Sequence, residues 1–315
     1  MSDCPVGDLA AFGAADAAGR ARIGAEVDWI CRETGFLAVD GHGVPEATIA
    51  GLQAAARAFF DLPRERKARV APEPGQPYGW LGPGAEALAR SKGVETPPDL
   101  KESFNGGPLA RPEGMTDPQA LAFCYAPTPW PDLPGFRDAW EAYYREMERL
   151  AARIMEVFAV ALGRPEGFFA PFIGAPISAL RALNYPATDR PPEVAQQRAG
   201  AHTDYGSLTI LLPEAGSRGL EILGRDGAWR EVPPVPGAFV VNIGDLMELW
   251  TGGRWRSTLH RVTVPPQHAG RRRMSLAFFH QPDWFAEIAP LDGGSGETVL
   301  SGPYLMAKFA AATGA

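Results

Sequence analysis

The sequence predicts an α+β protein with a mainly β core, in which short strands form an antiparallel sandwich or barrel and helices flank it. Two observations support this prediction. Residues 179–282 contain short runs rich in Val, Ile, Leu, Thr and Phe that are separated by Gly, Pro and Asp turns, a spacing typical of such β folds. Earlier in the chain, apolar residues recur every three to four positions, which indicates amphipathic helices.

The expected elements follow from these patterns in chain order. The helices are expected at residues 18–32, 46–60, 136–162 and 303–311, and a buried strand at residues 36–39. Residues 71–134 are rich in Gly and Pro and weakly periodic, so we expect covering loops there. The candidate strands of the core are ALRALNY, GSLTILL, GLEIL, WREV, AFVVNI, LHRVTV and MSLAFFH.

Length and composition indicate one folded domain. The chain has 315 residues, of which 45% are hydrophobic and 21% charged, and this is ordinary usage for a globular protein. We expect a single domain over residues 1–315. It would comprise an N-terminal helical and loop region (1–134), a long supporting helix (135–174), the β core (175–285), and a C-terminal tail and helix (286–315).

Charge, cysteine usage and hydropathy argue against several classes of protein. The net charge is -7, and the basic run at residues 271–273 is too small for a nucleic-acid surface. Three cysteines without CxxC spacing do not make a disulfide framework or a thiolate zinc site. The start MSDCPVGDLA lacks a secretory pattern, and no apolar run approaches the roughly 18 to 20 residues of a membrane span. We expect a cytoplasmic monomer or weak homodimer without nucleic-acid or membrane partners.

The segment AHTDYGSLTILL carries two candidate metal ligands. His202 and Asp204 stand two apart at the expected start of a strand, which would point both side chains to one face. His260 begins a later β run and would be the third ligand. Two histidines and one carboxylate suit Fe(II), because they leave coordination positions open, whereas zinc favours a closed tetrahedron. The triplet alone is weak, since a lone strand histidine is more often a core or surface residue.

A second group of residues suits a carboxylate. In RRRMSLAFF, Arg273, Ser275, Ala277 and Phe279 alternate onto one face of the expected strand. A guanidinium followed two positions later by a hydroxyl can grip a carboxylate with paired hydrogen bonds. The alternative is a surface basic cluster, which remains open for Arg271 and Arg272.

These motifs occur in an order that resembles the isopenicillin N synthase-like branch of the Fe(II)/2-oxoglutarate oxygenases, whose pattern is HxD, about fifty residues, H, then RxS. GFLAVDGHGVP, FDLP and DLKESF resemble three N-terminal segments of that family. WREVPPVPGAFVVNIGDLMELWTGGRWRSTLHRV is similar to the family stretch that leads into the distal histidine. The resemblance covers most of the chain.

The resemblance implies a double-stranded β-helix, or jelly roll, flanked by N-terminal helices, one long central helix and a C-terminal helix. It implies Fe(II) bound by His202, Asp204 and His260, with 2-oxoglutarate and dioxygen as cosubstrates. The distal carboxylate of 2-oxoglutarate would be held by Arg273, Ser275 and Tyr185. The gap between His260 and Arg273 is longer than usual, so the choice of Arg273 depends on Ser275 and the strand phase.

Further residues are candidates for the substrate pocket or for structural roles. Arg181 shares its strand phase with Tyr185, so it would enter the barrel and favour an anionic substrate or make an additional contact to the cosubstrate. The alternative is that it pairs with a surface acid at the rim. Phe104, Tyr78 and Phe279 are further pocket candidates. Among the remaining histidines, His42 is expected to stabilise a turn, and His268 and His280 are expected to be spectators.

The function expected from this resemblance is oxidation, and in particular hydroxylation, of a small organic substrate with release of succinate and CO2. One alternative is an oxidase of the same fold that does not use 2-oxoglutarate, and another is an ethylene-forming enzyme. From other classes, a non-catalytic barrel protein and a zinc-dependent barrel enzyme also remain open. The identity of the substrate stays open.

Overall fold

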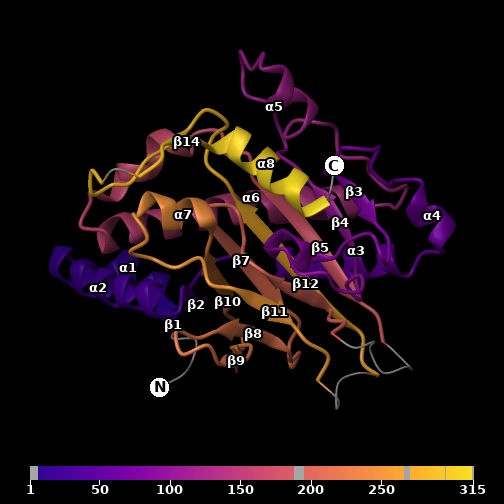
Figure 1. The fold of residues 1–315 in the computed structure, drawn as a ribbon, viewed down its shortest axis with the longest axis horizontal. Helices are drawn as coiled ribbons and strands as arrows, with labels where there is room; N and C mark the ends of the chain where they lie inside the picture. The colour runs from indigo at the N-terminus through magenta and orange to yellow at the C-terminus, as the bar shows by residue number, and fades with distance from the viewer. Residues whose placement is uncertain (1–5, 188–194, 266–269, 295, 314–315) are drawn as a thin grey trace.

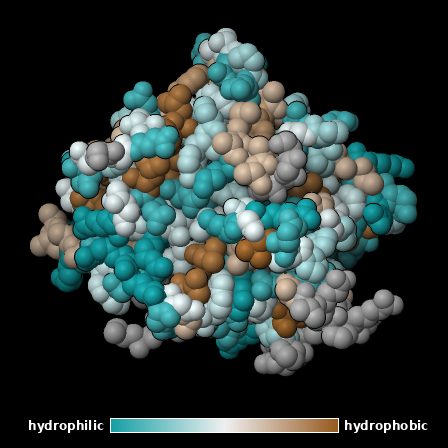
Figure 2. Space-filling model, in the orientation of Figure 1, coloured by the Kyte–Doolittle hydropathy of each residue, from teal (hydrophilic) through white to brown (hydrophobic). Residues whose placement is uncertain are grey.

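The computed structural model describes residues 6–187, 195–265, 270–294 and 296–313. Two β-sheets form the centre, and helices cover one of them from outside (Figure 1). The α+β expectation with a mainly β core is therefore confirmed. On the face drawn in Figure 2, hydrophilic residues predominate and hydrophobic ones form separate patches. In the described part of the chain, no helix is long and apolar enough to cross a membrane.

The major sheet has eight strands, and all neighbouring pairs except β1 and β2 are antiparallel. In spatial order these strands are β1 (Val6–Asp8), β2 (Phe36–Asp40), β10 (Phe239–Ile243), β7 (Leu208–Pro213), β12 (Arg273–His280), β5 (Ala179–Tyr185), β4 (Glu102–Gly106) and β3 (Gly79–Leu81). All seven β runs expected in the core occur as strands in one of the two large sheets.

The minor sheet has four strands and packs over part of the major sheet. Its order is β6 (Ala199–His202), β11 (His260–Val262), β8 (Leu220–Leu223) and β9 (Trp229–Glu231). Apolar residues from both sheets meet between them, including Phe36 and Val240 of the major sheet and Ile222 and Val262 of the minor sheet. This is the two-sheet packing of a jelly roll. A separate two-stranded sheet joins β13 (Glu287–Ile288) and β14 (Val299–Leu300).

The helices lie mainly outside the major sheet. They are α1 (Leu9–Ala14), α2 (Ala17–Glu33), α3 (Glu46–Phe60), α4 (Arg64–Ala68), α5 (Pro118–Ala122), α6 (Phe136–Ala161), α7 (Asp245–Trp250) and α8 (Ser301–Thr313), with the 3-10 helices η1 (Leu88–Lys92) and η2 (Glu166–Phe172). The expected helix at residues 46–60 coincides with α3. Helix α2 extends one residue beyond each end of the expected range 18–32, and Gly35 shortly after it adopts a φ of +66°.

Helix α6 backs the outer face of the major sheet. Its long apolar stripe is buried, and the Tyr144 ring meets the Phe278 ring of β12 at 5.1 Å. Helices α2 and α3 pack along α6, so all three helices rest on the same side. The other face of the major sheet is thereby left to the minor sheet and to the polar residues described below.

Strand β12 shows how the two faces alternate. Met274, Leu276 and Phe278 belong to the main core beside α6, whereas Ala277 clusters with residues of the opposite face, Leu183, Tyr185 and Phe279. The two-residue period expected for Arg273, Ser275, Ala277 and Phe279 is therefore confirmed. We call this second face, turned toward the minor sheet, the interior face.

Two expectations about local structure were wrong. Residues 71–134 are not only loop, because β3 and β4 lie within them and extend the major sheet. Strand β4 has no alternating apolar pattern because its polar residues are themselves buried: Glu102 accepts hydrogen bonds from Lys67, Trp80 and Asn184, each at 2.8 Å. In addition, His202 and Asp204 do not start a strand, since His202 ends β6 and Asp204 lies in the turn that leads to β7.

Candidate active site

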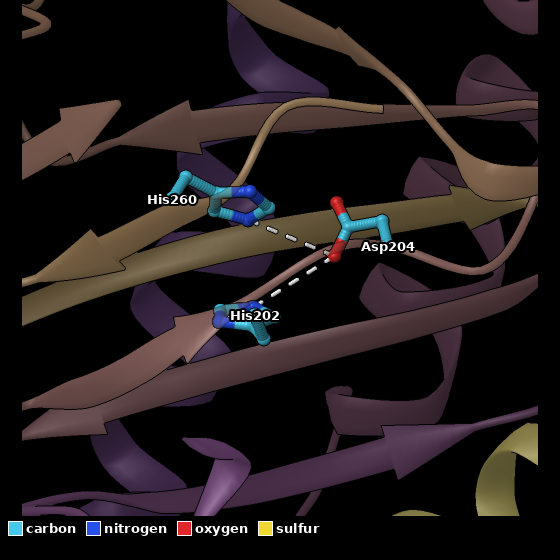
Figure 3. Close-up of side chains that lie close together, drawn as sticks. All are labelled: His202, Asp204 and His260. Carbon is cyan, nitrogen blue, oxygen red and sulfur yellow. Dashed lines mark ion pairs between the residues drawn. The ribbon is translucent and has the colours of Figure 1, made fainter. Parts of the chain in front are cut away.

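Three side chains converge at one end of the minor sheet. His202 of β6 and His260 of β11 are opposite each other in register, and the turn after β6 brings Asp204 between them. Asp204 Oδ1 lies 3.8 Å from Nε2 of each histidine, as Figure 3 shows. The candidate ligand atoms all lie within 4.8 Å of one another.

Hydrogen bonds from outside the triad orient each of the three groups. The Nδ1 atoms of His202 and His260 face the carbonyl oxygens of Gly200 and Thr258, at 2.7 and 3.0 Å. A carbonyl only accepts, so each Nδ1 carries the proton and each Nε2 keeps its lone pair.

Asp204 is oriented in the same way. Its Oδ2 accepts hydrogen bonds from Thr209 Oγ1 at 2.6 Å and from Asn242 Nδ2 at 2.8 Å. Oδ1 is therefore directed toward the two histidines. Outer partners that fix the ligands in this manner are typical of metal sites in proteins.

The charge state of the triad suits a cation. Burial and then the neighbouring His260 lower the pKa of His202 to about 3. Burial alone would raise the pKa of Asp204, but the two histidines and the donors Thr209 and Asn242 outweigh it and lower that pKa. A neutral imidazole and a carboxylate are the forms that bind metal. The pKa of His202 therefore lies below the ordinary histidine value of about 6.5, and the residue stays neutral well below that pH.

The residues fit a metal of the Fe(II) type. Asp204 Oδ1 lies 3.8 Å from each Nε2, so the two nitrogens and the carboxylate oxygen converge on one point. Small side-chain rotations would bring all three atoms to the bond length of about 2 Å that such ligands make. Two nitrogen donors and one carboxylate on one side of the ion leave its other positions open, as in non-haem iron oxygenases.

A buried cationic pocket lies farther along the interior face. Arg273 stands opposite Tyr185 in register, with its guanidinium carbon 5.2 Å from the Tyr185 ring. Nε and Nη1 of Arg273 and Oγ of Ser275 are buried and have no hydrogen-bond partner among the described residues. Burial lowers the pKa of Arg273. Such unsatisfied donors are costly unless a ligand completes them, and a carboxylate matches them in charge and geometry.

Arg198 adds a second cation to this pocket and was not among the residues predicted from the sequence. It precedes β6, is buried, and donates from Nη2 to the Arg271 carbonyl at 2.8 Å. Burial and then the charge of Arg273 lower the pKa of Arg198. The sequence signal was an arginine four positions before His202, but its proximity to Arg273 depends on the pairing of distant strands.

Two of the four candidates for the substrate pocket, Arg181 and Phe279, lie on the interior face. Arg181 is opposite Ala277 in register, and its guanidinium carbon lies 5.9 Å from the Phe279 ring. Arg181 enters the interior and pairs there with a largely buried acid, Glu86, through Nη1–Oε distances of 3.1 and 3.3 Å. Its expected role toward the substrate stays a prediction.

Of the other two pocket candidates, Phe104 was wrong, whereas Tyr78 stays a prediction. Phe104 is opposite Ala182 in register, on the helix side, and packs edge-on against Phe59 and Phe136 in the main core. The Tyr78 hydroxyl donates to the Cys124 carbonyl at 2.9 Å. The strand phase of β4 separates Phe104 from the triad, and this phase was hidden when the segment was taken as loop.

The remaining histidines have structural surroundings. His42 accepts a hydrogen bond from Val44 N at Nδ1 and lies 3.0 Å from the Gly237 carbonyl at Nε2, as expected for a turn residue. His280 shares the phase of Phe278 and pairs with Ser207 Oγ at 2.6 Å, away from the triad. His268 lies outside the described residues.

Two family models match the chain. Residues 177–282 match the 2OG-Fe(II) oxygenase superfamily, and residues 4–133 match the N-terminal region of the non-haem dioxygenases in morphine synthesis. Together, the two matched segments include strands β4, β5, β7, β10 and β12 of the major sheet.

Relatives with named activities span nearly the whole chain. Validamycin A dioxygenase of Streptomyces hygroscopicus subsp. limoneus is 36% identical, over 96% of this chain and 85% of its own length. The homoarginine-6-hydroxylase 2-ODD-233 of Oryza sativa subsp. japonica is 31% identical, over 90% of this chain and 87% of its own. The crystal structure of a full-length Neurospora crassa protein in complex with alpha-KG and thymine has a TM-score of 0.84 at 28% identity, covering 98% of this chain and 96% of that one.

The fold and the triad thus define a jelly-roll oxygenase with a non-haem iron site. The chain belongs to the 2OG-Fe(II) oxygenase superfamily. It is an Fe(II)- and 2-oxoglutarate-dependent dioxygenase that oxidises a small substrate.

Proposed function

We propose that His202, Asp204 and His260 hold the iron, and that Arg273, Ser275 and Tyr185 hold the distal carboxylate of 2-oxoglutarate. The observation that carries the second assignment is the group of buried donors on Arg273 and Ser275, which lack partners within the described part of the chain. A carboxylate satisfies these donors together, and Arg198 adds a further positive charge nearby.

When bound, the iron couples the reduction of dioxygen to decarboxylation of 2-oxoglutarate, so that one oxygen atom enters succinate and the other the substrate. Asp204 and the two histidines orient the metal. The apolar residues Leu183, Leu211 and Ala277 line the interior between the triad and Arg273 and exclude water from it. We infer that hydroxylation of a C–H bond is the reaction.

The substrate is proposed to lie beside Phe279 and Arg181, on the same interior face as the cosubstrate pocket. The names of the relatives mention validamycin A and homoarginine, and the Neurospora crassa protein was crystallised with thymine. All three are small polar molecules, which supports a substrate of that size for this chain.

The remaining expectations are also proposals. We propose that the chain acts as one domain, as a monomer or weak homodimer, in the cytoplasm. The acidic net charge of -7 supports the absence of a nucleic-acid partner.

Oxygen consumption tests the proposed function. Protein loaded anaerobically with Fe(II) should consume dioxygen and form succinate only when 2-oxoglutarate is added. Oxygen uptake that is independent of 2-oxoglutarate would indicate an oxidase, and ethylene in the headspace would indicate an ethylene-forming enzyme. Tight stoichiometric zinc without succinate formation would contradict the proposal altogether.

A further inference from the structure

Strand β4 places two small polar residues beside Arg181. Asn105 is opposite Arg181 in register, and Ser103 is opposite Leu183. Directly opposite residues of neighbouring strands share a face of the sheet. Ser103 and Asn105 therefore lie on the interior face, together with Arg181 and Ser275, whereas Phe104 between them faces the helices.

Both residues hold a buried oxygen atom that lacks a partner. Asn105 Nδ2 donates to the Pro77 carbonyl at 3.2 Å, which fixes the orientation of the amide and leaves Oδ1 as a pure acceptor. Within the described ranges, neither Asn105 Oδ1 nor Ser103 Oγ has a hydrogen-bond partner, although both residues are at least 97% buried. Buried polar atoms are normally satisfied, so these two are suited to a ligand.

The charges next to this pair are already balanced. Arg181 pairs with Glu86 at 3.1 Å, and Lys101 lies between Glu86 at 3.3 Å and Asp99 at 3.2 Å. Burial alone would raise the pKa of Glu86, but Arg181 and Lys101 outweigh it and lower that pKa to about 2. Two cations thus face two carboxylates. A substrate carboxylate would have to displace Glu86 to reach the guanidinium of Arg181.

The position of this charged group is fixed by the backbone around the metal triad. Asp99 Oδ1 accepts a hydrogen bond from Gly200 N of β6 at 3.0 Å, and η1 lies against the same strand. A side chain on Gly200 would come within 2.9 Å of Ala89 N. The close approach therefore requires glycine, and it holds Glu86 and Lys101 beside the strand that carries His202.

We propose that Ser103 and Asn105 form a substrate subsite that selects an uncharged group with N–H or O–H donors, such as a primary amide, an imide or a hydroxyl, and that Glu86 excludes carboxylates by neutralising Arg181. This inference rests on the proposed function, because it assigns the substrate class of the same interior cavity. The Phe279 ring, close to Arg181, offers the apolar surface for the rest of the substrate.

A ligand-free measurement tests the subsite independently of iron and 2-oxoglutarate. The metal-free protein and its Ser103→Ala and Ser207→Ala variants are compared by thermal unfolding. Both serines are fully buried, but Ser207 Oγ pairs with His280 Nδ1. Ser103→Ala should leave Tm unchanged or raise it by up to about 3 °C, whereas Ser207→Ala should lower it by roughly 2 to 6 °C. If Ser103→Ala lowered Tm as much as Ser207→Ala, the subsite would be overturned, because Ser103 would then be a structural residue.

A second measurement tests the substrate class. Primary amides, their N,N-dimethyl amides and the matching carboxylates, each on several aryl and alkyl scaffolds, are titrated into protein loaded with 2-oxoglutarate and Mn(II) in place of Fe(II). The primary amides should bind more tightly than the other two series. Tighter binding of the carboxylates, or no binding of any primary amide, would overturn the proposal.

Variants separate the two parts of the proposal. Asn105→Leu should weaken primary amides about 2- to 12-fold relative to the N,N-dimethyl amides, since one neutral hydrogen bond is lost. Glu86→Gln should shift the ratio of carboxylate to amide affinity toward carboxylates by at least about 10-fold, because the charge of Arg181 becomes available. An unchanged ratio of primary-amide to N,N-dimethyl-amide affinity in Asn105→Leu would contradict the subsite. An unchanged ratio of carboxylate to amide affinity in Glu86→Gln would contradict the role of Glu86.

Tyr143→Phe is the matched control. The Tyr143 hydroxyl is also buried without a partner in the described structure, but the residue belongs to the helix-side core. The affinity ratios between the amide, N,N-dimethyl amide and carboxylate series should therefore equal those of the wild type. Failure of the proposed function would appear separately, as absent succinate formation by the wild-type protein with Fe(II) and 2-oxoglutarate.

Discussion

His202 and His260 stand opposite each other on β6 and β11, with their ring centres 4.3 Å apart. The two histidines are therefore brought together by strand pairing, while Asp204 is placed by a turn and by side-chain hydrogen bonds. The carboxylate is accordingly the ligand whose orientation depends most on neighbouring residues.

The hydrogen bond from Thr209 should therefore influence metal affinity. Thr209→Val keeps the shape of the side chain but removes the donor 2.6 Å from Asp204 Oδ2. Loss of an outer partner of this kind typically costs about 10- to 100-fold in metal affinity. Equilibrium dialysis of Fe(II) under anaerobic conditions measures the effect, and an unchanged dissociation constant would show that Asp204 does not need this donor.

Arg273→Lys should weaken 2-oxoglutarate binding by roughly 10- to 150-fold, because an ammonium group cannot form the paired hydrogen bonds of a guanidinium. The KM for 2-oxoglutarate in succinate formation is the readout. Arg272→Lys is the control, since Arg272 binds Asn184 and Asp61 instead. Equal effects of both substitutions would contradict the assignment of Arg273.

The stability of the metal-free protein should decrease in acid through His280. Burial lowers the pKa of His280 to about 4, below the ordinary value of about 6.5. Between these values the unfolded chain binds a proton that the folded protein does not, so this stability is complete above about pH 6.5 and is lost as the pH falls toward 4. The slope from this one group is about 1.4 kcal/mol per pH unit.

Urea unfolding of the wild type and of His280→Asn at pH 7, 6 and 5 measures this slope. The variant should lose less stability on acidification, whereas His202, whose pKa is also lowered by burial, contributes equally to both proteins. Parallel losses in the two proteins would show that His280 does not remain neutral in the folded state.

Phe104→Ala should destabilise the protein without changing its substrate preference. The ring is fully buried among Phe59, Phe136 and Trp140, and truncation of such a ring costs about 3 to 5 kcal/mol. Urea unfolding gives the free energy, and the titrations with amides and carboxylates give the preference. A change in their affinity ratio would place Phe104 at the substrate after all.

Strong local patterns allowed much of the fold to be predicted. The strand from Arg273 to His280 and the helix from Glu46 to Phe60 carry clear hydrophobic periods, so their phase was correct, and with it the placement of Arg273 and Ser275 on one face. The triad was also named correctly as a group of neighbours, although the reason was partly wrong, because Asp204 lies in a turn rather than on a strand.

The residues that were missed depend on contacts between distant segments. Glu102 is buried by donors 35, 22 and 82 positions away in sequence, so β4 shows no apolar alternation from which a strand, or its phase, could be recognised. The proximity of Arg198 to Arg273, and of Glu86 to Arg181, likewise follows from strand and loop packing. No local pattern distinguishes these charges from solvent-exposed ones.

The central claim is that His202, Asp204 and His260 hold the iron that drives turnover of 2-oxoglutarate. The most direct test compares His260→Ala with His280→Asn, both loaded anaerobically with Fe(II) and then supplied with 2-oxoglutarate and dioxygen, with bound iron and succinate as the readouts. We predict that the wild type and His280→Asn bind one iron per chain and form succinate, whereas His260→Ala loses both. Stoichiometric iron and a wild-type rate of succinate formation in His260→Ala would contradict the account.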